Sequence, residues 1–352
     1  MKSLIAFSVM AILLLLSVTV LGHNASTQIA YAQTNSTGAT LPDFNFATVG
    51  DWDCNSRAEK TAENIQARNP QLVLGLGDYV YGEDSADCWL EIVEPIDDNM
   101  KIVIANHETK SPSLLKQYMS HFALPEQYYS FDYQNVHFTV MADELPREKG
   151  SEQYIFVQNA LAKAAADPNI DWIIVAHHSQ KYASTKNYIV QNNDKWKDTY
   201  HPLFEQYNID LILQGHHHSY QRTFPIKFNS GTSIGTPLDA IIADKNESNN
   251  YTNPEGQIFI TVGTGGASLF PFKGKPPYMA SQYKGYGFLN VDIINSNNVN
   301  NDGTTTLVGT FYANEDEDEE EDEEDPDNGG ESAEEEQQEH IIDQFTITKS
   351  NR

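Results

Sequence analysis

Residues 72–81 read Leu-Val-Leu-Gly-Leu-Gly-Asp-Tyr-Val-Tyr. The first five residues are typical of a buried β-strand, and the Gly-Asp pair that follows is typical of the turn that ends one. Asp78 and Tyr81 therefore lie directly beyond the carboxyl end of a predicted strand. Ligands of open α/β sheets bind at that end of the strands. The stretch thus predicts a buried strand together with a candidate binding position.

The same order, an apolar run followed by polar residues, recurs along the chain. Helical patterns separate several of the runs, and we predict helices at Arg57–Arg68 behind a Ser56 cap, at Glu152–Ala166 and at Lys197–Tyr207. Such an alternation of strands and helices indicates an α/β fold. The predicted strands are Phe44–Val49, Leu72–Leu76, Lys101–Ala105, Val136–Met141, Trp172–Ala176, Asp210–Leu213 and Gln257–Val262.

Five of these strands are followed by residues that can bind a metal ion. Carboxylates, an amide, a phenol and imidazoles form the mixed oxygen and nitrogen set that borderline transition metals use. A structural role as a helix cap, a turn residue or a buried histidine explains any one of these residues as well as a metal-ligand role does. Structural roles do not explain why such residues follow five strands in order. The residues are Asp51 and Asp53, Asp78 and Tyr81, Asn106, His107 and Glu108, His177 and His178, and His216, His217 and His218.

The ordered motifs resemble those of the calcineurin-like metallophosphoesterases, and in particular of their purple acid phosphatase branch. The resemblance runs from about Phe44 to Phe270 and includes the glycine-rich Val262–Gly266. It implies a four-layer αββα sandwich with two central mixed β-sheets. The family's D-x-G, G-D-x-x-Y, G-N-H-[ED], V-x-x-H and G-H-x-H stand here as Asp51–Asp53, Gly77–Tyr81, Ala105–Glu108, Val175–His178 and Gly215–His218.

The resemblance also implies a site for two metal ions. Asp78 would bridge the ions, which requires a carboxylate at this position. A phenolate ligand such as Tyr81 favours Fe(III), so the implied pair is Fe(III) with Fe, Zn or Mn. By resemblance, one ion is bound by Asp51, Asp78, Tyr81 and His218, and the other by Asp78, Asn106, His178 and His216.

The implied activity is the hydrolysis of small phosphate monoesters, as in an acid phosphatase. In such enzymes two metal ions hold the attacking and leaving oxygens, and a hydroxide acidified by them attacks phosphorus. In the family His107 is not a ligand; it lies beside the phosphate, where it stabilises charge or protonates the leaving group. The near alternative is a phosphodiesterase or nucleotidase on the same metals. A more distant one is a non-catalytic cell-surface module that binds metal or phosphate.

Four residues near the motifs are assigned supporting roles. Glu108 orients the His107 imidazole or its loop, the alternative being a surface carboxylate. His177 packs behind the ligands, because the family spacing selects its neighbour as the ligand. Tyr220 and Arg222, close to the family's H-x-Y-E-R, support the ligand loop, approach the substrate or form a purely structural clasp.

Two positions depart from the family pattern. Asp53 stands where the purple branch has Gly and other branches have His, and its possible roles are a loop cap, an acceptor behind the ligands or an extra ligand. Ala105 replaces a Gly, which adds one methyl group at a close-packed point, and we expect it to be tolerated.

The two cysteines, Cys54 and Cys88, follow the first and second ligand loops. An isolated pair outside the cell is usually a disulfide, and two buried free thiols are the alternative. We predict the disulfide, which would tie together the loops that carry Asp51 and Asp78.

The amino-terminal segment precedes the first motif. Residues 1–32 read as a secretory signal peptide with an Ala-x-Ala site at 30–32, or as an uncleaved membrane anchor. Residues 33–43 read as a flexible leader. We therefore expect a secreted or cell-surface protein with one metallophosphoesterase domain over residues 44–352.

The formal net charge is −28. It disfavours binding to nucleic acids and to anionic membranes, which attract Lys and Arg. Residues 314–340 hold 17 of the 50 carboxylates and lie between the strand-like runs Thr304–Tyr312 and Ile341–Thr348. We predict a disordered acidic insert between two paired strands. It is a solvated spacer or a weak site for Ca²⁺ and other cations.

Overall fold

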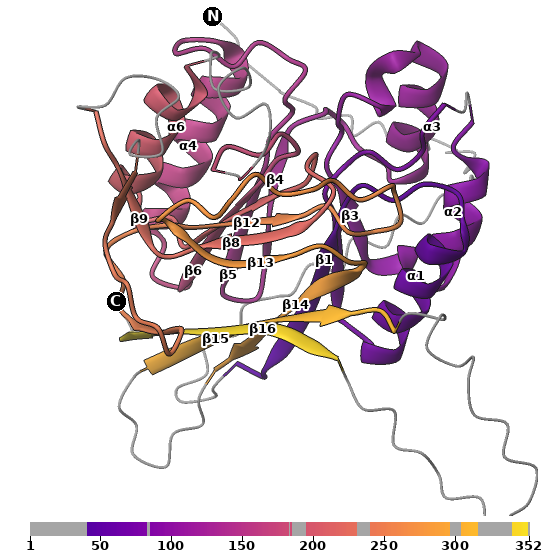
Figure 1. Ribbon diagram of the computed structural model, residues 1–352. Helices are drawn as coiled ribbons and strands as arrows, with labels where there is room; N and C mark the ends of the chain where they lie inside the picture. Colours follow the sequence, from indigo (N-terminus) through magenta and orange to yellow (C-terminus); the bar gives the residue numbers. More distant parts are fainter. Residues whose placement is uncertain are drawn as a thin grey trace, which may run out of the picture. The chain divides into compact units, whose positions relative to one another are not determined.

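The computed structural model describes residues 41–82, 85–182, 184, 195–230, 240–295, 304–315 and 340–350, all within the structural unit Thr40–Arg352. In these ranges two seven-stranded β-sheets lie at the centre, and helices cover their outer faces (Figure 1). The expected four-layer αββα sandwich with two mixed sheets is confirmed.

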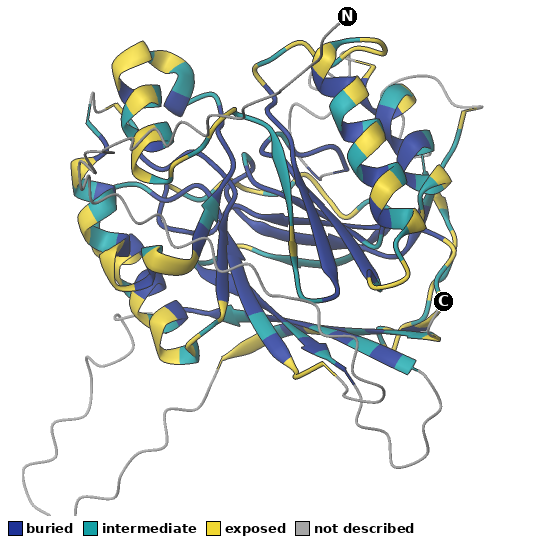
Figure 2. Ribbon diagram, turned by 180° about the vertical axis from the view of Figure 1, so that it is seen from behind, coloured by how far each residue is buried: buried dark blue, intermediate teal, exposed yellow. Residues whose placement is uncertain are grey.

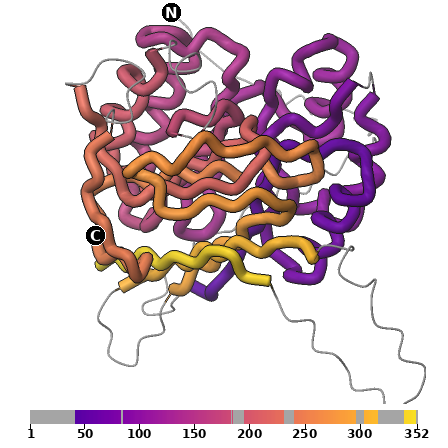
Figure 3. Tube along the Cα trace, viewed as in Figure 1, coloured from indigo at the N-terminus to yellow at the C-terminus, as the bar shows by residue number. Residues whose placement is uncertain are grey.

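The first sheet contains β1 (Phe44–Val49), β2 (Leu72–Gly75), β3 (Met100–Ile102), β11 (Asn250–Thr252), β14 (Gly287–Ile294), β15 (Thr304–Ala313) and β16 (Ile341–Ser350). Its order is β11-β16-β15-β14-β1-β2-β3. β1, β2 and β3 run parallel, whereas β14 is antiparallel to both β1 and β15. The first and the last strands of the chain therefore share one sheet, as the indigo and yellow traces of Figure 3 show.

The second sheet contains β4 (Tyr129–Tyr133), β5 (Val136–Val140), β6 (Trp172–Ala176), β7 (Leu211–Gln214), β8 (Tyr220–Thr223), β12 (Ile258–Val262) and β13 (Met279–Tyr283). Its order is β13-β8-β12-β7-β6-β5-β4, and β5, β6, β7 and β12 run parallel. Every residue of these four strands is buried, because a parallel sheet is covered on both faces. β9 (Ile226–Phe228) and β10 (Ala240–Ile242) form a separate ribbon.

Five α-helices of the described chain cover the sheets. α1 (Ser56–Arg68), α2 (Asp87–Val93) and α3 (Pro112–His121) lie on the first sheet, and α4 (Glu152–Ala166) and α6 (Trp196–Gln206) lie on the second. Each helix turns its buried face toward a sheet and its exposed face outward (Figure 2). Two short 3₁₀ helices, η1 (Glu94–Asn99) and η2 (Glu108–Lys110), follow α2 and β3.

The inner faces of the two sheets share one apolar core. The Phe46 ring of the first sheet packs edge-on against Phe138 of the second, with centroids 5.3 Å apart. The Trp172 indole donates to the Thr305 hydroxyl at 3.1 Å, so β6 of the second sheet is also joined to β15 of the first. Burial of such large side chains is the main source of stability for the sandwich.

The predicted strands and helices all occur, with shifted ends. β3 is shorter than predicted and ends at Ile102, before the chain turns toward the ligand loop. The predicted cap of α1 was wrong by one residue: Asn55, not Ser56, accepts hydrogen bonds from the Arg57 and Ala58 amides. An Asn side chain one residue earlier reaches these free N–H groups as well as a Ser does.

The predicted pairing of the last two strands is confirmed, because β15 and β16 are antiparallel neighbours. Their ends meet beside the acidic insert, where the Ala313 amide donates to the His340 carbonyl at 2.9 Å. Residues 316–339 of the insert, and the predicted signal and leader segments through residue 40, lie outside the described residues. In the described part of the chain, no helix is long and apolar enough to cross a membrane.

We predict that replacing residues 316–339 by a short turn leaves the fold intact. The two strand ends are already in contact, and each halving of a loop lowers its closure cost by about 0.6 kcal/mol. Asn314 is kept, because its buried side chain bonds Asn64 and Thr61. Thermal unfolding should show an unchanged or higher midpoint, and a fall of several degrees would mean that the insert contributes to the fold.

We also predict that buried His201 limits stability in acid. Burial lowers the pKa of His201 to about 3, while the unfolded chain binds the proton near pH 6.5. Stability is therefore lost as the pH falls from 6.5 toward 3, by about 3 kcal/mol at pH 4.5. His201→Gln keeps hydrogen bonds to Tyr182 and Gln257 without titrating. Urea unfolding at pH 7 and 4.5 should show a smaller loss in the variant, and equal losses would contradict the prediction.

Candidate metal centre

The candidate ligands lie where the carboxyl ends of strands from both sheets meet. β1, β2 and β3 bring Asp51, Asp78 and Asn106 from the first sheet, and the loops after β6 and β7 bring the histidines from the second. Two hydrogen bonds join the loops: the His216 amide donates to Asp51 Oδ2 at 2.7 Å, and His178 Nδ1 donates to the Leu76 carbonyl at 2.7 Å. The site is thus built across the gap between the sheets.

The backbone at this junction is strained. Asp51, Asp78 and His216 have φ values of 59°, 55° and 70°, a left-handed region that costs a non-glycine residue about 1–3 kcal/mol. Gly77 has a φ of 90°, and a Cβ there would lie 2.5 Å from the Ala105 Cβ. The Ala105 methyl group is accommodated because Gly77 has no side chain.

Three donor atoms form one side of the centre. Asp51 Oδ1, Tyr81 Oη and His218 Nε2 lie 3.1–3.3 Å from one another. The other nitrogen of His218, Nδ1, lies 2.7 Å from the Ser268 carbonyl. A carbonyl only accepts, so Nδ1 carries the proton and Nε2 presents its lone pair to the cluster, as in histidines that bind metals.

Asp78, His178 and His216 form the other side. His178 Nε2 lies 3.1 Å from both Asp78 Oδ2 and His216 Nδ1, and one donor atom of each residue falls within 4.8 Å of the others. Two imidazole nitrogens and a carboxylate at these distances need a proton or a cation among them. Asp78 Oδ2 also lies 3.5 Å from Tyr81 Oη, which places this carboxylate between the two clusters.

Asn106 is joined to the second cluster through the next residue in the chain. Its neighbour His107 donates its amide to Asp78 Oδ1 at 3.1 Å, so the Asn106 main chain lies beside this carboxylate. The Asn106 side chain is half-buried.

The charges of the centre favour a bound cation. Burial would raise the pKa of Asp78, but His178 and His107 lower it to about 2. Burial would lower the pKa of His178, but Asp78 raises it to about 10. Burial and then Asp51 and Asp78 raise the pKa of Tyr81 well above its ordinary value. The protein alone thus keeps protons among these donors, and metal ions with this donor set would displace them.

His107 lies at the edge of the centre rather than within it. Its Nε2 is 3.9 Å from Asp78 Oδ2, and its ring packs against the Tyr81 ring with centroids 4.2 Å apart. Nδ1 lies 3.2 Å from the Val80 carbonyl. The side chain is 16% exposed, so part of it is open to solvent.

A family model described as calcineurin-like phosphoesterase matches residues 44–220, half of the chain. The chain belongs to this family. Among curated relatives, "Acid phosphatase type 7" of Mus musculus is 27% identical over 63% of this chain and 55% of its own length. "Purple acid phosphatase 23" of Arabidopsis thaliana is 24% identical over 62% and 52%. These relatives support the purple acid phosphatase-like branch of the family.

"Probable inactive purple acid phosphatase 1" of Arabidopsis thaliana is 28% identical over 66% of this chain and 40% of its own length. The solved structure of purple acid phosphatase PPD1 from yellow lupin (Lupinus luteus) seeds aligns with a TM-score of 0.65 and 20% identity, over 88% of this chain and 54% of that one. It supports the fold. The chain spans about half the length of the curated relatives it matches.

In this calcineurin-like phosphoesterase Glu108 supports the loops of the centre. It is fully buried, not a surface carboxylate. Its two oxygens accept hydrogen bonds from the Asp78, Tyr79 and Ala105 amides at 2.9–3.1 Å. The carboxylate therefore fixes the loop of the bridging candidate rather than the imidazole of His107.

His177 faces away from the donors. It is buried, its Nδ1 lies 3.3 Å from Asp143 Oδ2, and its ring packs against Trp196. Asp143 also accepts the Ser179 amide at 2.6 Å and so holds the segment after the His178 ligand candidate. Sequence reasoning missed Asp143, although it too follows a strand, β5.

Tyr220 and Arg222 bind a carboxylate at the other end of the chain. The Tyr220 hydroxyl donates to Asp343 Oδ2 at 2.7 Å, and Arg222 donates to both oxygens of Asp343 at 2.7 and 2.9 Å. Arg222 is fully buried. The pair therefore clasps β8 to β16, as the structural alternative expected.

Asp53 has a φ of 92°, which explains why the family has Gly there. Its Oδ1 accepts the Cys54 amide at 2.8 Å, so the side chain caps its own loop. The predicted disulfide between Cys54 and Cys88 is present and ties this loop to α2.

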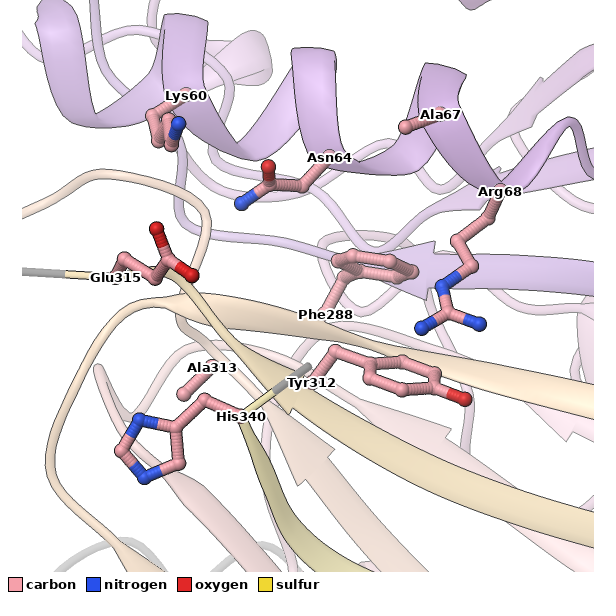
Figure 4. A pocket seen from close by; sticks show the side chains of 9 residues that line it. All are labelled: Lys60, Asn64, Ala67, Arg68, Phe288, Tyr312, Ala313, Glu315 and His340. Atoms are coloured by element: carbon pink, nitrogen blue, oxygen red, sulfur yellow. The ribbon is translucent and has the colours of Figure 1, made fainter. Parts of the chain in front are cut away.

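A separate pocket of about 350 Å³ lies between α1 and the ends of β14 and β15, beside the two ends of the acidic insert (Figure 4). Arg68 lies over the Tyr312 ring there, 3.7 Å from its centroid. The pocket shares no residue with the candidate ligands.

We predict that Asp53→Gly leaves metal content unchanged. Glycine adopts a φ of 92° without strain, which offsets loss of the cap and keeps stability within about 1 kcal/mol of the wild type. Asp53→Asn is the matched control, since it keeps the cap and removes the charge. Metal analysis of both variants tests the cap assignment, and loss of an ion in both would identify Asp53 as a ligand.

Proposed function

We propose that the protein is an exported phosphoesterase with two metal ions that hydrolyses phosphate monoesters, as acid phosphatases do. The observation that carries this proposal is the position of Asp78. Its carboxylate touches Tyr81 on one side and His178 on the other, as a ligand shared by two ions must.

The donor set fits two ions held as the sequence motifs imply. The first ion would be held by Asp51, Tyr81 and His218. The second ion would be held by Asn106, His178 and His216. Asp78 would bind both ions. When bound, such ions neutralise phosphoryl charge and acidify a water molecule. Fe(III) with Fe, Zn or Mn suits the phenol of Tyr81 and the nitrogen ligands opposite.

Residues of the chain hold the ligand loops and bind the substrate. Glu108 holds the Asp78 loop in its strained conformation, and the Asp51 carboxylate holds the His216 amide. We infer that His107, which is partly exposed and close to Asp78, binds the phosphoryl group or gives a proton to the leaving oxygen. The small phosphorylated substrate is thereby bound and oriented.

The alternatives differ in substrate or in activity. The relatives named acid phosphatases support monoesters, while a phosphodiesterase or nucleotidase would use the same centre. A non-catalytic module is disfavoured, because all seven candidate ligands and His107 are present. The disulfide and the residues 1–32 that read as a signal support export.

We predict about two metal ions per chain, iron included, in protein purified without added metal. A visible absorption band from a phenolate on Fe(III) should be present and should disappear in Tyr81→Phe. Tyr128→Phe, outside the site, is the matched control and should keep it. Plasma mass spectrometry and absorption spectra make the test.

The other results are equally informative. If the protein holds two ions but neither iron nor the visible band is found, the phosphoesterase proposal stands and the purple acid phosphatase-like metal pair is rejected. Protein that holds no metal after reconstitution would contradict the proposed function.

A further inference from the structure

We propose that Lys110 is a substrate-binding residue that favours phosphate monoester dianions over diester monoanions. The inference rests on the proposed phosphoesterase function and adds a determinant of substrate class to it.

The short helix η2 brings Lys110 to the site. In a 3₁₀ helix side chains three residues apart lie on the same side, and Lys110 comes three residues after His107, the cap of η2. The Lys110 ammonium accordingly lies 2.7 Å from His107 Nδ1 and 3.1 Å from its Nε2. An ammonium is thus held against the imidazole.

That imidazole adjoins the candidate metal centre. His107 Nε2 is 3.9 Å from Asp78 Oδ2, and its ring packs on Tyr81. Lys110 therefore contacts the side of the centre that His107 occupies, with the imidazole between it and Asp78. The lysine is exposed, so a phosphoryl oxygen can reach its ammonium.

The charge of Lys110 is available for a ligand. Among the residues that the structure describes, no carboxylate forms an ion pair with it, and its ammonium contacts His107. An imidazole carries no negative charge and therefore does not compensate the charge of the ammonium. A phosphoryl oxygen placed beside both side chains would accept from the ammonium and gain a charge-assisted hydrogen bond.

The number of charges on the substrate decides the selectivity. Near neutral pH a phosphate monoester carries about two negative charges and a diester one, so the attraction of a fixed ammonium is about twice as large for the monoester. Both esters meet the same metal ions and the same His107. Lys110 therefore adds a preference for monoesters to whatever preference the metal ions and His107 give.

The test compares p-nitrophenyl phosphate with bis(p-nitrophenyl) phosphate at pH 7, on protein loaded with two metal ions. Both substrates release the same leaving group, so any effect transmitted through protonation by His107 is shared. Lys110→Met should lower kcat/KM for the monoester by about 10-fold or more and for the diester by at most about 3-fold. Lys110→Arg keeps the positive charge and should therefore retain most of the wild-type kcat/KM for the monoester.

Lys116→Met is the matched control, because Lys116 is an exposed lysine on the neighbouring α3. It makes the same change in net charge and should alter neither rate. Equal losses on both esters in Lys110→Met would show that Lys110 acts through His107 and would overturn the proposal.

Binding of inorganic phosphate, followed by calorimetry, separates this proposal from the proposed function. Lys110→Met should raise the phosphate Kd by about 10-fold, with no change in Lys116→Met. A wild-type protein that hydrolyses neither ester would contradict the proposed function, while the phosphate titration would still decide the role of Lys110. An unchanged phosphate Kd in Lys110→Met would overturn it.

Discussion

The hydrogen bond from the His216 amide to the Asp51 carboxylate joins a loop of the second sheet to a loop of the first. The bond from His178 to the Leu76 carbonyl makes a second such link. Both donor clusters depend on them, because each cluster combines residues from the two sheets. Without these links, nothing would hold the ligand loops of the first sheet against those of the second at these two positions.

The conformation of the ligand loops costs free energy, and neighbouring residues stabilise it. Three candidate ligands have positive φ values, and their carboxylates and imidazoles are crowded together before any cation is bound. Glu108 offsets part of this cost by binding three backbone amides of two loops. The disulfide between Cys54 and Cys88 restrains the loop of Asp51 from outside the centre.

The end of the chain also serves the site. Asp343 on β16 binds Tyr220 and Arg222, which directly follow the ligand loop ending at His218. Because this contact is buried, the last strand fixes the start of β8 and, through it, the loop. The acidic insert joins the end of β15 to the start of β16, at the end of the sheet where β1 also ends, since Ala313 pairs with Gly287 and Leu289 with Thr48.

The sequence by itself determined the strands, most of their helices and the types of the candidate ligands. Buried parallel strands have unbroken apolar runs, and residues that bind metals lie at short, fixed spacings after them, so both features are local. It could not assign Asp143, Asp343 or the loop role of Asp53, and it left Lys110 unmarked. Only the tertiary structure decided which strands share a sheet and which side chains meet. Contacts between residues more than a hundred positions apart, such as Arg222 with Asp343, leave no periodic pattern in the chain.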